Sequence, residues 1–139
     1  EDHEYVLVLE DDVIFKQDPF EYISKVIFEC KVNNINFDCV FMGEAALRVG
    51  DKRDVFFKKE HPATNGLCTV LYNVASAKKV LNSLNMFHID NALDWHFNKV
   101  FQDLDFHVYW GKAITEHGSV TAVHDENRKG LKSSLRSHY

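Results

Sequence analysis

The chain has 139 residues, of which 45% are hydrophobic and 13% aromatic. This length suits one domain, and the apolar content is sufficient for a core of ordinary size. The formal net charge of −5 at pH 7 argues against a basic face that binds nucleic acid. Two prolines and six glycines exclude a fibrous or low-complexity chain. No run reaches the roughly 18 apolar residues that a membrane span needs.

The first predicted element is the apolar run Tyr5–Leu9. Because both faces of this run are apolar, it predicts a buried central strand. The run begins almost at once, and neither an initial Met nor a signal peptide precedes it. We therefore expect residues 1–139 to be a single partial domain, the C-terminal part of something longer.

A helix is predicted next. Asp18 followed by Pro19 is a typical helix start, with Asp18 as the N-cap. Apolar residues then recur at helical spacing until Asn33 and Asn34 end the pattern. These apolar residues are Phe20, Ile23, Val26, Ile27 and Cys30.

Strands and helices alternate along the rest of the chain. Further strands are predicted at residues 39–42, 68–72 and 105–110, with a short one at 55–57 inside a long connection. Further helices are predicted at residues 75–84 and 89–101. This alternation predicts an α/β fold with a mixed, mostly parallel sheet flanked by helices, and ligands at the carboxyl ends of the strands. Residues 120–139 are polar and predict a flexible tail.

Three adjacent carboxylates, Glu10, Asp11 and Asp12, follow the first apolar run. They repel one another, and a divalent cation such as Mn²⁺ or Mg²⁺ removes that repulsion. Strand alternation would place Glu10 and Asp12 on one face, toward the metal, and Asp11 on the other, toward a sugar or ribose hydroxyl. The alternative is a solvated strand end, which is commoner for one acid than for three.

Residues 5–15, YVLVLEDDVIF, resemble the core segment of glycosyltransferase family 25, which includes lipooligosaccharide and procollagen galactosyltransferases. Residues 66–81 and 88–94 resemble later segments of the family in the same order. The resemblance implies a GT-A-like sheet that lacks its N-terminal nucleotide-binding strands. It also implies an inverting, metal-dependent transfer of a hexose such as galactose. The donor would be a nucleotide-diphosphate sugar, typically a UDP-sugar, and the acceptor a hydroxyl of a glycan or of a hydroxylysine-type residue.

Two acids near the start of a predicted helix are candidates for the catalytic base. Asp90 is the first choice, and Asp94, one turn further on the same face, is the second. The helix dipole favours a carboxylate there, so from the residues alone a capping role explains Asp90 at least equally well. The resemblance favours catalysis, because an inverting transfer needs a base for the acceptor proton.

His117 is the best candidate among eight histidines for a third metal ligand. The resemblance implies that a late His completes the site with Glu10 and Asp12, and imidazole is a good ligand for Mn²⁺. An ordinary loop histidine is an equal alternative, and His124 is the second choice.

Asn65 and Gly66 precede a predicted strand. They would contact the donor sugar if the resemblance holds, or form a plain turn. Trp95 and Trp110 are either acceptor-stacking residues or core residues. The basic tail is either a lid over the donor diphosphate or a solvated terminus.

Two other functions remain open from the sequence. One is a non-catalytic, glycosyltransferase-like accessory domain of a multidomain protein. The other is a metal-dependent phosphohydrolase, which usually needs a second acid cluster that is not evident in the sequence. The compartment would be cytoplasmic for a bacterial or viral protein and the endoplasmic reticulum lumen for a collagen-modifying one. Three cysteines without C-x-x-C spacing predict buried, reduced thiols.

Overall fold

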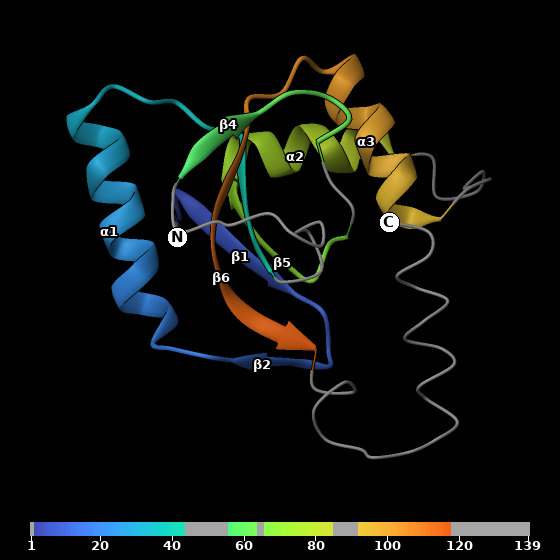
Figure 1. Ribbon diagram of the computed structural model, residues 1–139. Coiled ribbons are helices and arrows are strands. Elements are labelled where there is room, and N and C mark those ends of the chain that lie inside the picture. The colour runs from blue at the N-terminus through green and yellow to red at the C-terminus, as the bar shows by residue number, and fades with distance from the viewer. Residues whose placement is uncertain (1, 44–55, 64–65, 85–91, 118–139) are drawn as a thin grey trace, which may run out of the picture.

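The computed structural model describes residues 2–43, 56–63, 66–84 and 92–117. These residues form a six-stranded sheet with helices packed against it (Figure 1). In chain order the elements are β1 (Tyr5–Leu9), β2 (Val13–Phe15), α1 (Pro19–Val32), β3 (Cys39–Gly43), β4 (Phe57–Lys59), β5 (Thr69–Asn73), α2 (Val74–Ser83), α3 (Leu93–Asp103) and β6 (Val108–His117). The strand order is β1-β5-β3-β6-β2, and β4 pairs with β6 beside this path. The predicted α/β class is confirmed.

The sheet is mixed, and the predicted predominance of parallel pairing is wrong. β5 runs antiparallel to β1 and β3, whereas β6 runs parallel to β3 and antiparallel to β2 and β4. The pairing of β3 with β6 is the one parallel pairing among the described strands. Alternation of elements misled the prediction because no described helix joins β3 to β5, and a parallel pair needs a long crossover, usually a helix.

Three strands nevertheless share one direction. β1 and β3 both oppose β5, and β6 is parallel to β3. The last residues of β1, β3 and β6 therefore lie at the same edge of the sheet as the first residues of β5. We call this the carboxyl edge. It is the edge at which the sequence predicts ligands.

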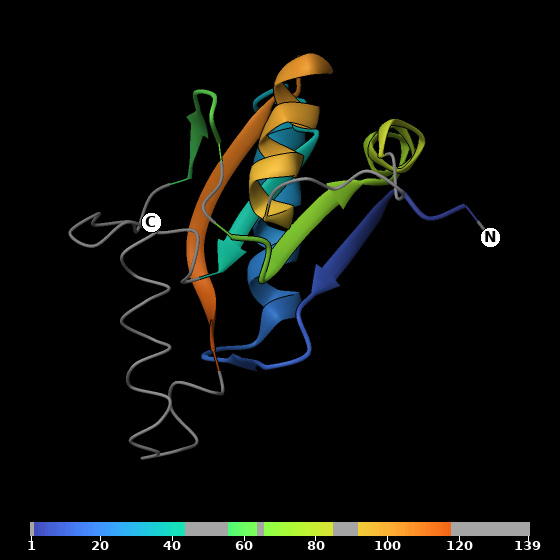
Figure 2. The same ribbon diagram turned by 90° about the vertical axis from the view of Figure 1, so that its right-hand side faces the viewer.

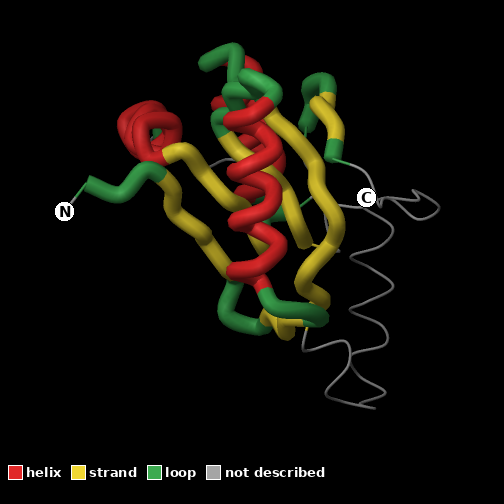
Figure 3. Tube along the Cα trace, turned by 90° about the vertical axis from the view of Figure 1, so that its left-hand side faces the viewer, coloured by secondary structure: helices red, strands yellow, loops and turns green. Residues whose placement is uncertain are grey.

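The helices lie on both faces of the sheet, α1 on one and α2 with α3 on the other (Figure 3). β3 is fully buried, and its alternate residues enter two cores, as a period of two requires. The core beneath α1 includes Val26, Cys30, Val40, Met42, Leu71 and Ile114. The core beneath α2 and α3 includes Phe41, Val70, Val80, Val100, Phe101 and Trp110. Burying each large side chain contributes about 1.5–3 kcal/mol, so β3 is the centre of the fold.

The first helix begins and ends where the sequence predicts. The Asp18 carboxylate accepts hydrogen bonds from the N–H groups of Phe20 and Glu21, at 2.9 and 3.4 Å. After the C-cap Asn33, Asn34 adopts a φ of 55°, a left-handed conformation that Asn tolerates. Phe20, which the apolar pattern assigns to the buried face, is 78% exposed.

β1 is an edge strand of the described sheet, so its predicted central position is wrong. Val6 and Val8 are 38% and 46% exposed. On the other face Tyr5 and Leu7 pack against the core beneath α1. Apolar residues on both faces predict burial, but they do not determine which strand lies alongside.

Other boundaries differ from the predictions by a few residues. β2 was not predicted, β4 begins two residues later than expected, and β6 runs on to His117. The helix predicted at residues 89–101 corresponds to α3; residues 89–91 and the predicted tail lie outside the described residues. Within the described part no helix has the length and apolar character needed to cross a membrane.

β6 bends strongly along its length (Figure 2). Its pairing with β3 shifts between Trp110 and Thr115. At this irregularity the N–H of Lys112 donates to the Tyr22 hydroxyl of α1 at 2.7 Å. Gly111 makes this approach possible, because a Cβ there would lie 2.8 Å from the same hydroxyl oxygen. Beyond this contact, the second half of β6 runs toward the carboxyl edge.

The three cysteines are buried free thiols, as predicted. Burial raises the pKa of the Cys30 thiol and raises that of Cys39 well above its usual range. Thiols with raised pKa values are poor nucleophiles at neutral pH, so Cys30 and Cys39 belong to the core.

Candidate functional site

The acid triplet lies at the carboxyl edge. β1 ends at Leu9, and the N–H of Glu10 donates to the Cys68 carbonyl, just before β5, at 3.0 Å. Asp11 and Asp12 form the turn into β2, with Asp11 exposed and Asp12 half-buried. The predicted alternation of the three side chains does not hold, because the strand ends before it reaches them. A turn places acids by its own geometry rather than by the period of a strand.

β2 brings this turn to the end of β6. Val13, which follows Asp12 directly, is in register with His117. On the other side of the turn, Glu10 is tied to Cys68. The backbones of the three predicted metal ligands therefore meet at one edge of the sheet, although they come from both ends of the described chain.

Whether Glu10, Asp12 and His117 fit a metal ion is judged by the type of donor atom that each supplies and by where their backbones lie. Two carboxylates and an imidazole suit Mn²⁺, and carboxylates suit Mg²⁺. Only the backbone of His117 is described. Among the side chains that are described, no group of three or more His, Cys, Asp or Glu could hold a metal ion.

A pocket of about 310 Å³ lies at the carboxyl edge between β1, β5 and α3. Three predicted site residues line it: Glu10, Gly66 and Asp94. The remaining lining residues are apolar or aromatic: Val8, Leu9, Leu67, Val70, Tyr72, Leu93 and Phe97. The fold thus joins three separate sequence segments, predicted to bind metal, donor and acceptor, around one cavity.

Asp94 is the buried carboxylate of this pocket, only 7% exposed. Its Oδ1 accepts a hydrogen bond from the Trp95 N–H at 3.0 Å. Its Oδ2 is buried and has no hydrogen-bond partner within the described part of the chain. An unpaired buried polar atom costs about 1–3 kcal/mol, and more when charged. The N-terminal end of α3 offsets about 0.3–1 kcal/mol of that cost, so a donor from a ligand would still be favoured here.

Three of the lining residues have ionisable side chains. They are Glu10, Asp94 and Tyr72. Burial raises the pKa of Tyr72, so this phenol stays neutral at physiological pH.

A buried threonine pair near the carboxyl edge was missed by sequence reasoning. Thr69 at the start of β5 and Thr115 in β6 are both 0% exposed, and their hydroxyl oxygens are 2.5 Å apart. Gly43, in register with Thr115, ends β3 between them. A Cβ on Gly43 would overlap the Cys68 Sγ. No local sequence pattern predicts that Thr69, Gly43 and Thr115 lie together, because they come from three different strands.

The structure separates the two tryptophans. Trp110 is 1% exposed, and its indole N–H donates to the Ala63 carbonyl at 2.7 Å, so it is a core residue. Trp95 is 60% exposed and adjoins Asp94, so it remains a candidate for stacking on a sugar. Asn65, Asp90 and His124 lie outside the described residues.

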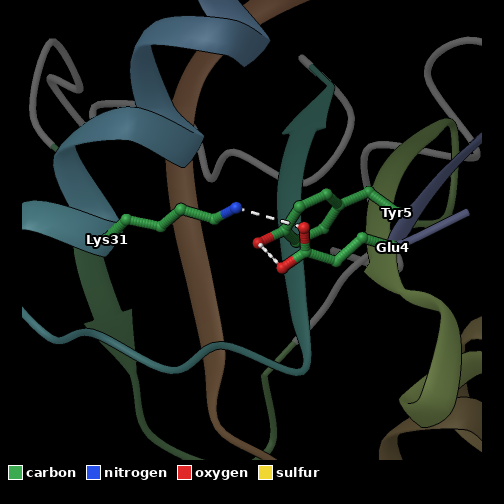
Figure 4. A network of polar contacts seen from close by, with 3 residues as sticks. All are labelled: Glu4, Tyr5 and Lys31. Carbon is green, nitrogen blue, oxygen red and sulfur yellow. Dashed lines mark hydrogen bonds and ion pairs between the residues drawn. The ribbon is translucent and has the colours of Figure 1, made fainter.

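The opposite edge of the sheet carries a second pocket, of about 250 Å³, lined by Glu4, Tyr5 and Lys31 among others. Figure 4 shows Lys31 and the Tyr5 hydroxyl both directed toward the Glu4 carboxylate. Lys31 Nζ lies 3.1 Å from Glu4 Oε2, and the Tyr5 hydroxyl donates to Oε1 at 3.0 Å. The hydrogen bond from Lys31, followed by that from Tyr5, lowers the pKa of Glu4. Burial and the bond to Glu4 raise the pKa of Tyr5 to about 12.

Comparison with protein-family models, with curated proteins and with solved structures gave no match to this chain. The likeness to glycosyltransferase family 25 therefore depends on the motifs described above.

Proposed function

We propose that this chain carries the active site of a metal-dependent glycosyltransferase of the family 25 type. It would transfer a hexose such as galactose, with inversion, from a nucleotide-diphosphate sugar to a hydroxyl of a glycan or protein acceptor. The observation that carries the proposal is the pocket at the carboxyl edge, which Glu10, Gly66 and Asp94 line together. Each was selected from a different segment, for a different step of one reaction.

The fold supports this proposal at the level of strand direction. β1, β3 and β6 end at the same edge, as a nucleotide-sugar site at the carboxyl ends of strands requires. A GT-A-like sheet would continue beyond β1, whose outer edge is unpaired in the described sheet.

The metal would be held by Glu10, Asp12 and His117. When bound, Mn²⁺ or Mg²⁺ neutralises the charge that develops on the diphosphate leaving group. Asp11 and the Asn65–Gly66 loop would contact the donor. Gly66 is buried at the pocket wall, where the absence of a side chain lets a ligand approach the backbone.

The transfer needs one base. The acceptor oxygen forms a bond to the anomeric carbon while the bond from that carbon to the diphosphate oxygen breaks. The acceptor proton passes to a carboxylate, and the nucleoside diphosphate leaves. Asp90 is the first candidate for this carboxylate, and Asp94, which lines the pocket, is the second.

The decisive experiment measures donor hydrolysis and transfer with a panel of UDP-sugars, with Mn²⁺ and with a chelator. We expect turnover with at least one sugar and its loss on chelation. Absence of metal-dependent turnover and of donor binding with every sugar would refute the proposal. That result would leave a non-catalytic accessory domain as the better interpretation.

Three variants assign the roles. Asp12→Ala should abolish turnover, because it removes a metal ligand. Asp90→Asn should retain donor binding and lose transfer. Asp103→Asn, an exposed acid at the far end of α3, is the matched control and should behave as wild type. Normal transfer by Asp90→Asn would move the base assignment to Asp94.

A further inference from the structure

We propose that Asn98 is a positioning residue for the pocket at the carboxyl edge. Its side chain holds Ala63, and through Ala63 it holds the part of the pocket lining formed by Gly66 and Leu67, which we call the glycine wall. The inference deepens the proposed function and rests on it for its kinetic consequence, because Gly66 belongs to the loop that would contact the donor.

Ala63 is buried outside the sheet, and side chains bind its backbone. It is 0% exposed and belongs to no helix or strand. Its N–H donates to Oδ1 of Asn98 in α3 at 2.9 Å, and its carbonyl accepts from the indole N–H of Trp110 in β6 at 2.7 Å. Buried backbone groups need such partners. The position of Ala63 therefore depends on α3 and β6 and not on pairing with a strand.

A histidine holds the same segment of chain two residues earlier. His61 Nε2 lies 3.0 Å from the Phe106 carbonyl oxygen. A carbonyl can only accept, so Nε2–H is the donor. Phe106 lies between α3 and β6 in the chain. Residues 61–63 are thus bound to α3, to β6 and to the connection between them.

Chain connectivity carries this restraint to the pocket. Gly66 is three residues after Ala63, and a chain of three residues spans at most about 11 Å. After the glycine wall, the Cys68 carbonyl accepts from the Glu10 N–H at 3.0 Å, and β5 begins at the next residue. The glycine wall therefore lies between two fixed points, one bound to α3 and β6 and the other to the end of β1.

The helix that binds Ala63 also lines the pocket. Asp94 and Phe97 of α3 are lining residues, and Asn98 is one helical turn after Asp94 on the same side of the helix. Because one rigid element carries both the lining residues and Asn98, the hydrogen bond from Ala63 restrains the glycine wall relative to α3. Removing the Asn98 acceptor would leave a buried N–H unpaired and would loosen the wall.

Amide hydrogen exchange and chemical shifts of the full chain test the local effect of Asn98→Ala. We expect exchange of the Ala63 amide to accelerate at least about tenfold, and the amide signals of the glycine wall to shift. Exchange in β3 should stay within about threefold of wild type, because the opening is local. Asn98→Asp keeps the acceptor oxygen, so its Ala63 amide should also stay within about threefold of wild type. Asn82→Ala, which replaces an exposed Asn of α2, is the matched control and should change neither readout.

Donor kinetics test the consequence for the site. A loosened wall weakens contacts that the ground state and the transition state share. In Asn98→Ala the KM for the UDP-sugar should therefore rise at least about threefold while kcat stays nearly unchanged, and Asn98→Asp should restore the wild-type KM.

An Ala63 amide that exchanges in Asn98→Ala as in wild type, or that accelerates no more than the amides of β3, overturns the inference. So does faster local exchange with an unchanged KM, which would make Asn98 a structural residue only. If Asn98→Ala does not fold, Asn98→Ser, which shortens the side chain and keeps it polar, takes its place in both measurements. If the wild type has no donor turnover, the proposed function fails alone, and the amide measurements still decide whether Asn98 holds the glycine wall.

Discussion

The half-buried Asp38 and the buried Asp94 lie at opposite edges of the sheet, and they differ in how many of their carboxylate oxygens accept hydrogen bonds. At the edge away from the pocket, Asp38 accepts hydrogen bonds at both oxygens, from the Ser76 hydroxyl at 2.5 Å and the His107 N–H at 2.7 Å. At the carboxyl edge, Asp94 has one bond to its own helix and an unpaired buried oxygen. Within the described residues, both oxygens of the Asp38 carboxylate have a hydrogen-bond donor, whereas only one oxygen of the Asp94 carboxylate has one.

This difference separates a structural acid from a functional candidate. The Asp38 backbone N–H also donates to the His107 carbonyl, and the Asp38 carbonyl accepts from the Asn73 N–H, so Asp38 joins β3, the end of β5 and the approach to β6. Proteins rarely leave a buried polar atom unpaired without reason. The comparison predicts opposite responses to substitution at the two edges.

The largest effect on stability is expected at Asp38, whose two carboxylate oxygens both accept hydrogen bonds. Asp38→Ala leaves the buried Ser76 hydroxyl and the His107 N–H without their acceptor. We expect a loss of about 2–4 kcal/mol in the free energy of unfolding, measured by urea denaturation. Asp103→Ala is the exposed control and should stay within about 0.5 kcal/mol of wild type. A loss below about 1 kcal/mol for Asp38→Ala would show that its bonds do not stabilise this edge.

The next effect concerns the close approach at the end of β3. Gly43→Ala should cost about 1–3 kcal/mol, because the new methyl group overlaps the buried Cys68 Sγ in a packed interior. Cys68→Ala removes that sulfur atom, so the same substitution in the Cys68→Ala background should cost less. A double-mutant cycle from urea denaturation measures the difference. Additive effects would contradict the assigned clash.

A smaller effect on stability, of opposite sign, is expected at Asp94, whose Oδ2 has no partner within the described residues. Asp94→Asn removes a buried, unpaired charge, but it also removes a favourable interaction with the α3 dipole worth about 0.3–1 kcal/mol. Because the desolvation cost exceeds the dipole gain, we expect a net stabilisation of up to about 1 kcal/mol. The midpoint of urea unfolding checks this. Destabilisation by more than about 1 kcal/mol would mean that Asp94 has a structural role like that of Asp38.

The smallest effect is a pH dependence at Glu4. Hydrogen bonds from Lys31 and Tyr5 hold its pKa below the ordinary value, so its contribution is present above the unfolded-state pKa and is lost as pH falls through the folded-state pKa. Between about pH 5 and about pH 3 the Tm of wild type should fall slightly more than that of Glu4→Gln. Both charges of this pair are exposed, so added salt should reduce the difference. Parallel Tm curves would exclude the contribution.

Much of the secondary structure could be predicted from local patterns. The Asp18 cap, the helical spacing of Val26 and Cys30 and the buried run of β3 each depend on residues close together in the chain. Strand direction and position could not be predicted this way. The apolar run of β1 predicts a central strand. Whether a strand is central depends on its neighbours in the sheet, and those come from distant parts of the chain.

The candidate site divides along the same line. Glu10, Gly66 and Asp94 could be selected one by one, as an acid after a strand, a glycine in a loop and an acid at a helix start. That they line one pocket depends on β5 lying beside β1 and on the start of α3 lying near both strands. The apolar wall of Leu67, Leu93 and Phe97 and the Thr69–Thr115 pair carry no local signal of a site.

The sequence by itself determined which residue types follow each strand and where α1 begins, because capping, periodicity and turn chemistry act within a few residues. Only the tertiary structure decided that the acid triplet forms a turn, that His117 lies opposite Val13 and that Asp94 Oδ2 is buried without a described partner. Those features depend on strand pairing and helix packing across distant segments. Such contacts minimise the exposed apolar surface of the whole chain, and no local window contains that information.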